Sequence, residues 1–542
     1  MRKIQLFILG ALVMLSGCKD QLDVKNPNLP TTGSADTEKG LISLAQGSVY
    51  INGFYTLKYF GFQGTFWGDP FSYHEIMGDN VGYEAANQRG NELGVANYVI
   101  LDDNSKVNNP NSPLRQPDML RQVNINANAS DNPLYYEWAY MYALNAAGNN
   151  ILALVDKTTF SGNAETKKST LKAWAYWWKG YAYARIGSIY YAGIINDDPV
   201  NTNGKFVTKE DIIKESNSNF DKAAAALTAS TSATDYAEVV GKLIPDIFQV
   251  GKGGVLTVDM WKRNINTMKA RNILVNTTTK TMTAAQWTSI LDLVNAGIQT
   301  SDKVFTGRSN ATSDFFAASG NTPAAISTGA QPGYHISERL VQDFKTGDKR
   351  LENNFRSDAA TWIGNNDRGN IFNSRWYLID GGKGLPGVVS LGTREVGKYE
   401  LYMAGTYEEN ELMKAEALIN TGKIEDGLKI IDAIRTLQGA GLAPVAGTNL
   451  ALTAAKEELR RERRVVLPFR GLAFYDARRW SVIDDVSAGG GRTNAVVVDK
   501  NGKVNTKATI NYNFLDYWDV PDNELAYNKP AEGSVPVKNP KQ

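Results

Sequence analysis

The sequence contains few of the residues that build disulfides and metal sites, with one cysteine and two histidines among 542 residues. A single cysteine excludes an intramolecular disulfide. It also excludes thiolate zinc and iron–sulfur sites, because these need two to four cysteines in one chain. His74 and His335 lie far apart in the sequence, so no helix carries the H-x-x-x-H pair of a metallohydrolase. We therefore expect neither a metal centre of these kinds nor a cofactor.

The chain also lacks an excess of either charge. Its 58 Lys and Arg residues against 57 Asp and Glu residues give a formal net charge of +1, and the two signs are mixed throughout. A balanced charge creates no global field that would attract nucleic acid, so we expect no nucleic-acid partner. A content of 42% hydrophobic and 21% charged residues is typical of a folded globular body.

The N-terminus has the pattern of an export signal. A cationic start precedes an apolar run over residues 4–15, which is shorter than the about 20 residues that a membrane-spanning helix needs. Leu15-Ser16-Gly17-Cys18 then matches a bacterial lipobox, in which a peptidase cuts before a cysteine whose sulfur carries diacylglycerol. We predict a lipoprotein signal peptide over residues 1–17, a lipid anchor at Cys18 and a flexible polar tether over residues 18–34.

Residues 35–542 are predicted to form one body in which apolar residues recur at helical spacing. The blocks with this spacing are about 135–191, 211–300 and 407–483. Tyr135 to Asp156 and Glu165 to Tyr191 are expected to form an antiparallel pair of long helices. Further helices are predicted at Asp211 to Thr228, Val258 to Val275, Thr283 to Thr300, Thr453 to Val466 and Gly471 to Ile483.

The segment from Tyr407 to Leu437 shows the clearest unit of this body. It reads as a helix, a turn at Thr421-Gly422-Lys423 and a second helix, which is the unit of a tetratricopeptide repeat. Such a unit does not bury its apolar face alone, so we expect stacked partners.

Long segments rich in Gly, Asn, Thr and aromatic residues separate the helical blocks. They cover about 53–133, 304–393 and 487–542. Val496 to Val504 predicts a hairpin, because Asn501-Gly502 accepts the positive φ angles of a tight turn. The predicted fold is mainly α, with tetratricopeptide-like helical pairs packed against a loop-rich region that carries minor β-structure.

A series of motifs follows the lipobox in a characteristic order. They are Leu22-Asp23-Val24-Lys25-Asn26-Pro27, Phe344 to Arg350, Tyr407 to Leu418, Ile430 to Arg435, Glu457 to Arg464, Phe469 to Trp480 and Asp516 to Leu525. Their order and spacing resemble the SusD/RagB family of Bacteroidetes outer-membrane lipoproteins. Arg470 departs from the family pattern, which has an acidic residue before the glycine at 471, and Ala473 stands near the position of a usual basic residue.

The resemblance implies a SusD-like fold with irregular loops that form a ligand face. It also implies a surface-exposed lipoprotein of the outer membrane, anchored by lipid and facing the cell exterior. Such a protein binds oligosaccharide or polysaccharide nutrients, or in some members peptides, and delivers them to a SusC-like TonB-dependent transporter. The resemblance implies no enzymatic activity.

Glycan capture needs flat aromatic rings beside amide and carboxylate groups. The loop segments Phe60 to Tyr73 and Trp362 to Tyr377 contain this mixture. The predicted ligand-binding residues are Trp67, Tyr73, Trp362, Trp376 and Tyr377. For each single ring the alternative is packing in a loop-rich core. Asp79 and Asn80 are expected to order their loop, because Asp and Asn bond nearby backbone in turns, with calcium ligation as the alternative.

Other functions and roles stay open at this point. A surface glycoside hydrolase needs two carboxylates, and 57 acidic residues do not exclude such a pair although no motif marks one. Trp174 to Trp178 is at core spacing, and His74 is expected to be a satisfied loop or core residue. The basic run at 456–464 predicts a solvated or interface helix, because Glu457 and Arg461 have the stabilising i, i+4 order.

Overall fold

The computed structural model describes residues 36–50, 69–84, 89–307, 334–357, 361–364, 370–379, 382–386 and 400–541. The predicted signal peptide, the anchor at Cys18, the tether and Trp67 lie outside the described residues. The described part is mainly helical, as the sequence predicts. None of its helices has the length and apolar character needed to cross a bilayer.

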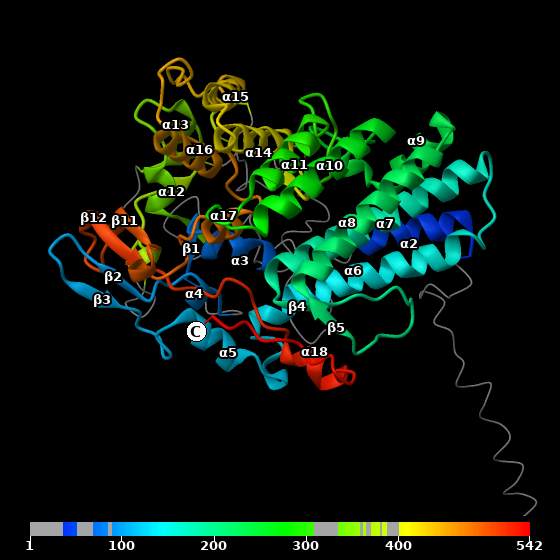
Figure 1. Cartoon of the computed structure of the whole chain (residues 1–542), viewed down its shortest axis with the longest axis horizontal. Coiled ribbons are helices and arrows are strands. Elements are labelled where there is room, and N and C mark those ends of the chain that lie inside the picture. Colours follow the sequence, from blue (N-terminus) through cyan, green and yellow to red (C-terminus); the bar gives the residue numbers. More distant parts are fainter. Residues whose placement is uncertain are drawn as a thin grey trace, which may run out of the picture.

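One group of helices surrounds the long helix α7, at the right in Figure 1. Its members are α2 (Glu38–Tyr50), α6 (Pro133–Val155), α7 (Ala164–Ile189), α8 (Lys209–Ala229) and α9 (Ala233–Leu243). Asn132 and Asn163 begin α6 and α7, because each side chain accepts a hydrogen bond from a free backbone N–H of the first turn. The predicted pair of long helices is confirmed.

Helix α7 forms the centre of this group because it is buried almost all round. Trp174, Trp177 and Trp178 are at most 1% exposed and pack against one another. The indole N–H of Trp174 donates to the carbonyl of Ala45 on α2 at 2.9 Å. The prediction that this tryptophan stretch packs in the core is confirmed.

A second group of helices lies beside the first, at the upper left in Figure 1. It contains α10 (Val258–Val275), α11 (Ala284–Asn295), α14 (Tyr407–Asn420), α15 (Ile424–Leu437), α16 (Leu452–Val466) and α17 (Ala473–Arg479). The helical hairpin predicted around Gly422 is confirmed, and Gly422 has a φ of 85° in the turn between α14 and α15.

Two of the predicted helices are shorter than the periodicity indicates. Helix α11 ends at Asn295, because the chain turns at Gly297 so closely past Asn410 that a Cβ there would lie 1.9 Å from its side-chain oxygen. Helix α17 ends at Arg479, and the flanking Gly471 and Ser481 have φ angles of 65° and 61°. Positive φ angles do not continue a right-handed helix.

Several shorter helices were missed because they have few residues or weak periodicity. They are α2, α3 (Asp69–Met77), α4 (Gly90–Leu93), α5 (Gln116–Val123), α9, α12 (Glu338–Gln342), α13 (Lys349–Asn354) and α18 (Asp522–Tyr527). The 3-10 turns are Asn126–Asn128, Asp246–Phe248, Asn370–Phe372 and Val486–Ala488. Helix α2 contains two glycines and packs against α6, α7 and α9, so tertiary contacts stabilise it.

The β-structure is minor and antiparallel. A four-stranded sheet in the order β11 (Arg492–Val498), β12 (Val504–Asn511), β2 (Tyr98–Ile100) and β3 (Lys106–Asn108) lies at the left in Figure 1. Two-stranded pairs join β1 (Val81–Tyr83) to β7 (Tyr334–Ile336), β4 (Ala192–Ile194) to β5 (Phe206–Thr208), β6 (Thr306–Gly307) to β10 (Leu401–Tyr402), and β8 (Phe355–Arg356) to β9 (Tyr377–Leu378). The predicted hairpin is confirmed, with Gly502 at φ 81° in its turn.

Helix α16 carries the basic run that predicts a solvated or interface helix, and its two faces show both environments. On that face Arg461 pairs with Glu457 at 3.1 Å. On the inner face Arg463 is 2% exposed and pairs with Asp476 of α17 at 3.0 Å, while Arg464 is 6% exposed and pairs with Asp343 at 2.5 Å. The inner face therefore joins helices through buried ion pairs.

Candidate functional site

Aromatic rings from separate segments meet beside the strand pair β1–β7. His335 of β7 stacks on Trp362, with ring centroids 3.7 Å apart and planes 17° apart. His335 also meets the ring of Tyr377 edge-on at 6.5 Å. We call this group the aromatic cluster; its members are Tyr83, Tyr334, His335, Trp362 and Tyr377, and Trp376 adjoins it as the chain neighbour of Tyr377.

Backbone pairing holds the aromatic cluster in place. Tyr83 and Tyr334 are register partners across β1 and β7, and their rings stack at 4.2 Å. Trp362 pairs with Ser374 through backbone hydrogen bonds of 2.8 and 3.2 Å. The hydroxyl of Ser374 donates to the carbonyl of Ile336 at 2.6 Å, which ties this segment to β7.

The structure brings the rings of Trp362 and Tyr377 together against His335, and the backbone of Trp376 joins them through Ser374. It also buries some of the predicted rings. Trp362 is 8% exposed, and Tyr377 is fully buried. Tyr73 lies in α3 and is 2% exposed. Trp376 is only partly buried, so among the described candidates it offers the most accessible ring. The role of these residues in ligand binding remains a prediction.

A hydrogen bond to Ser374 fixes the backbone of Trp376, and its indole N–H donates to no described residue. Its backbone N–H donates to the hydroxyl of Ser374 at 3.0 Å. Its indole Nε1 is buried and has no hydrogen-bond partner among the described residues. A buried N–H without a partner is costly unless a ligand or water satisfies it, so this indole is a candidate donor to a bound molecule.

Arg375 adds a charged donor beside Trp376, and residue-by-residue reasoning from the sequence missed it. Its guanidinium lies 2.7 and 3.1 Å from the carboxylate oxygens of Glu338, and its backbone N–H donates to the same carboxylate at 2.8 Å. Glu338 is 1% exposed, whereas the Arg375 side chain is 38% exposed. The pair therefore orients a guanidinium at the surface, on the residue that precedes Trp376. The only sequence signal was its place in the Arg-Trp-Tyr run.

Asp79 anchors the loops under the aromatic cluster. Its carboxylate accepts hydrogen bonds from Arg339 at 2.7 and 2.9 Å, from Ser337 at 2.8 Å and from Tyr512 at 2.6 Å. Burial favours the neutral acid, but the Arg339 guanidinium outweighs it and holds the pKa of Asp79 well below its usual value. These contacts agree with the predicted loop-ordering role.

Arg339 extends the contacts of Asp79 to two further segments. Its guanidinium donates to the carbonyl of Val496 in β11 at 3.1 Å and to that of Ile371 at 3.0 Å. The end of α3, the start of α12 and the β11–β12 hairpin thus share one buried ion pair.

Asn80 orders the same loop through its backbone and its side chain. Its carbonyl accepts from the backbone N–H of Ser337 at 3.0 Å, and its amide donates to Glu75 at 2.8 Å. Glu75 also accepts from the backbone N–H groups of Phe469 and Gly471 at 2.9 and 2.8 Å. Burial raises the pKa of Glu75. Among the described residues, no group of three or more His, Cys, Asp or Glu side chains is placed to hold a metal ion.

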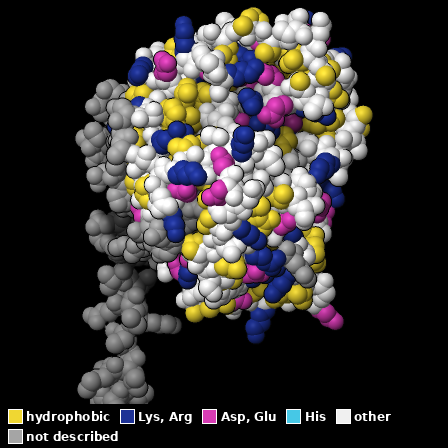
Figure 2. All heavy atoms as spheres, turned by 90° about the vertical axis from the view of Figure 1, so that its left-hand side faces the viewer, with side chains coloured by type: hydrophobic (Ala, Val, Ile, Leu, Met, Phe, Trp, Pro, Cys, Tyr) yellow, Lys and Arg dark blue, Asp and Glu magenta, His cyan; other side chains and the backbone are white. Residues whose placement is uncertain are grey.

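The aromatic cluster lies at the end of the molecule that carries the four-stranded sheet. Asn373 donates to the carbonyl of Asp499 in the β11–β12 turn at 3.1 Å, and Gly502 of that turn approaches Ile363. Helix α2, which begins two residues after Asp36, lies toward the opposite end of the long axis (Figure 1). On the described surface of the sheet end, hydrophobic side chains lie scattered among Lys and Arg, and no histidine is visible (Figure 2).

Helical hairpins packed against a loop-rich region with minor β-structure form a SusD-like fold. The model of the SusD family matches residues 299–532, which include the β7 strand, the tetratricopeptide-like hairpin and the C-terminal motifs. This match and the shared fold of the structures described next confirm the predicted resemblance to the SusD/RagB family. No curated protein matches it.

Solved structures share this fold at low sequence identity. A putative sugar-binding protein from Bacteroides vulgatus superposes with a TM-score of 0.57 and 15% identity, over 93% of this chain and 100% of that chain. A SusD superfamily protein from Parabacteroides distasonis gives a TM-score of 0.57 and 14% identity, over 93% of this chain and 99% of that chain. A structure solved with a xylogluco-oligosaccharide gives 0.54 and 14%, over 92% of this chain and 99% of that chain.

Proposed function

We propose that this protein is a surface lipoprotein of the outer membrane that binds oligosaccharide or polysaccharide nutrients and delivers them to a SusC-like TonB-dependent transporter. It binds its ligand without cleaving it. Membership of the SusD/RagB family supports this proposal, as do the sugar-binding description of one structural neighbour and the oligosaccharide bound to another. The observation that carries it for this chain is that the partly exposed Trp376 directly follows Arg375, whose guanidinium Glu338 orients at the surface.

This arrangement suits a sugar ring for physical reasons. One face of a pyranose is rich in C–H groups, which stack on an indole, and its edge carries hydroxyls, which accept hydrogen bonds from a guanidinium or an indole N–H. Because Glu338 and Ser374 already hold Arg375 and Trp376, little conformational entropy is lost when a ligand binds.

A flexible tether permits delivery as well as capture. Fully extended, residues 18–34 span at most about 60 Å. A body held at that distance by lipid is free to turn, so the aromatic cluster at the far end from Asp36 can face solvent or the transporter. Energy for uptake then comes from the transporter.

The test is a binding panel of plant and microbial glycans and of peptides, with the purified protein and its variants. We expect at least one glycan to bind, and Trp376→Ala to weaken that binding by about 5–30-fold, because loss of ring stacking costs on the order of 1–2 kcal/mol. Tyr527→Ala is the matched control, since this ring is 84% exposed and lies on α18.

Binding of peptides and of no glycan would contradict the proposed function. Glycan affinity that Trp376→Ala leaves unchanged would contradict the proposed site. The same glycans are also assayed for release of reducing sugar. Turnover that disappears on substitution of one carboxylate would replace the binding function with a hydrolase.

A further inference from the structure

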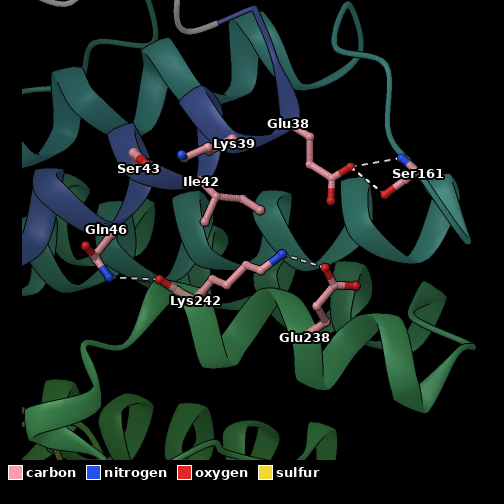
Figure 3. Close-up of a pocket in the computed structure, with 8 residues that line it drawn as sticks. All are labelled: Glu38, Lys39, Ile42, Ser43, Gln46, Ser161, Glu238 and Lys242. Atoms are coloured by element: carbon pink, nitrogen blue, oxygen red, sulfur yellow. Dashed lines mark hydrogen bonds and ion pairs between the residues drawn. The ribbon is translucent and has the colours of Figure 1, made fainter.

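A cavity of about 500 Å³ lies between α2, the α6–α7 connection and α9, far from the aromatic cluster. It is lined by Glu38, Lys39, Ile42, Ser43, Gln46, Ser161, Glu238 and Lys242. In Figure 3 the side chain of Ile42 points down from α2 into the middle of this space, and polar side chains surround it. The volume falls within the range of about 300–1,000 Å³ that is usual for small-molecule sites.

Hydrogen bonds close the cavity at both ends. At one end the amide of Gln46 donates to the carbonyl of Lys242 at 2.8 Å, which joins α2 to α9. At the other end the carboxylate of Glu38 accepts from the backbone N–H and the hydroxyl of Ser161, both at 2.9 Å. The cavity is therefore formed by bonded walls from three segments (Figure 3).

A buried lysine stabilises the carboxylates of the lining. The Lys167 side chain is 1% exposed, and its ammonium lies 2.7 Å from Glu38 and 3.0 Å from Glu238. Lys242 occupies the other oxygen of Glu238 at 2.5 Å. Hydrogen bonds from Lys242 and Lys167 lower the pKa of Glu238, so this carboxylate stays ionised and paired.

Lys39 is the cation of the lining that has no such partner. Among the described residues its ammonium makes neither a hydrogen bond nor an ion pair, and in Figure 3 it points along α2 toward Ser43. Lys39 and Ser43 are exposed and form the open rim. Lys39, Lys167 and Lys242 against Glu38 and Glu238 leave one net positive charge. The cavity thus combines one apolar side chain at its floor, Ile42 at 4% exposed, with a rim of donors and an unpaired cation.

We propose that this cavity binds a carboxylate-bearing sugar unit, a hexuronate, whose ring lies on Ile42 and whose carboxylate accepts hydrogen bonds from Lys39. The C–H face of a pyranose matches the apolar floor, its hydroxyls match Ser43 and Lys242, and its negative charge balances the unpaired ammonium. Because the cavity lies at the opposite end from the aromatic cluster, this site and the ligand face proposed above are tested independently of each other.

The experiment is a titration of the purified full chain with galacturonate and glucuronate and, in parallel, with galactose and glucose, by calorimetry or ligand-observed NMR. We expect the uronates to bind at least about fivefold more tightly than the neutral sugars, and added salt to narrow this difference. Lys39→Met weakens uronate binding by about fivefold or more, and Ser43→Trp fills the cavity and abolishes binding. Lys214→Met is the matched control, because this lysine is 78% exposed on α8.

The substituted residues are exposed, and unchanged thermal unfolding of each variant shows that its fold is intact. Equal affinity for uronates and neutral sugars overturns the proposal, and so does uronate binding that Lys39→Met and Ser43→Trp leave unchanged. If Trp376→Ala abolishes uronate binding while Ser43→Trp leaves it intact, the ligand occupies the aromatic cluster. That result overturns this site and supports the proposed function.

Discussion

Asp79 is the side chain on which the contacts beneath the aromatic cluster converge. It has a φ of 59° at the end of α3, where an aspartate adopts left-handed backbone more readily than most residues. Its pairing with Arg339 joins residues 260 positions apart in the sequence. Both side chains are buried, so loss of either leaves an uncompensated charge.

We predict that Asp79→Asn lowers the free energy of unfolding by about 3 kcal/mol, because the Arg339 guanidinium then remains buried without its carboxylate. Urea denaturation followed by circular dichroism measures this change. Asp103→Asn is the control, since Asp103 is exposed and bonds only its neighbour Ser105. Equal stability of the two variants would show that the buried pair contributes nothing.

His74 makes stability depend on pH. Its ring is fully buried, its Nε2 lies 3.1 Å from Glu137, and burial together with the nearby Arg185 lowers the pKa of His74 to about 4. The prediction that His74 is a core residue is confirmed. In the unfolded chain the pKa is about 6.5, so between these values the unfolded state binds a proton that the folded state does not.

The stability that neutral, buried His74 gives the folded state is therefore fully present above pH 6.5. It is lost as the pH falls toward 4, and the free energy of unfolding then decreases by about 1.4 kcal/mol per pH unit. Urea denaturation at several pH values between 4.5 and 7.5 measures the slope, and His74→Gln should flatten it. Glu75, whose pKa burial raises, contributes with the opposite sign. The difference between the slopes of the wild type and the variant is therefore the readout, and identical slopes would contradict the prediction.

The helices illustrate which elements a single sequence reveals. Long amphipathic helices such as α6, α7, α14 and α15 are predicted because each repeats its apolar spacing over several turns. Helices α3 and α5 lie in a segment expected to be loop-rich, since they are too short for the period to appear. Helix α16 is predicted as a solvated or interface helix, but the sequence does not tell which of its arginines are buried, because exposed and buried arginines of one run look alike.

One glycine in a turn between helices and one glycine inside a helix give a matched pair of predictions. Gly422 has a φ of 85° with no atom within 4 Å of a Cβ, so Gly422→Ala should lower the free energy of unfolding by about 1 kcal/mol through backbone strain alone. Gly241 lies within α9, where a Cβ meets only Val255 at 3.7 Å.

Gly241→Ala should therefore raise the free energy of unfolding by about 0.5–1 kcal/mol, because alanine is the better helix former. Urea denaturation of both variants measures the pair of changes. We expect the free energy of unfolding to fall for Gly422→Ala and to rise for Gly241→Ala. Destabilisation by both substitutions would contradict this prediction.

The whole molecule places its two candidate binding regions at opposite ends. The aromatic cluster lies beside the four-stranded sheet, while the cavity of Figure 3 lies next to Asp36, where the described chain begins. The tether and the anchor at Cys18 would join the membrane to the cavity end. The position of the anchor therefore decides which region is close to the lipid.

The anchor has a direct test. Cys18→Ser removes the sulfur that would carry lipid, so we expect the variant to leave the membrane fraction while the wild type stays in it. Labelling with a radioactive fatty acid checks acylation itself, and Ser16→Ala, which keeps a small residue before the cysteine, is the control. A Cys18→Ser variant that remains in the membrane fraction would show that another segment holds the protein there.

The sequence by itself determined the features that neighbouring residues create: the periodic helices, the turns at Gly422 and Gly502, and the order of motifs that resembles the SusD/RagB family. Only the tertiary structure decided which distant residues meet. It placed His335 on Trp362, paired Asp79 with Arg339, buried Tyr73 and Tyr377 while leaving Trp376 accessible, and opened a cavity between α2 and α9. The physical reason is that periodicity reports contacts within a few residues along the chain, whereas burial and ion pairing depend on how whole elements pack against one another.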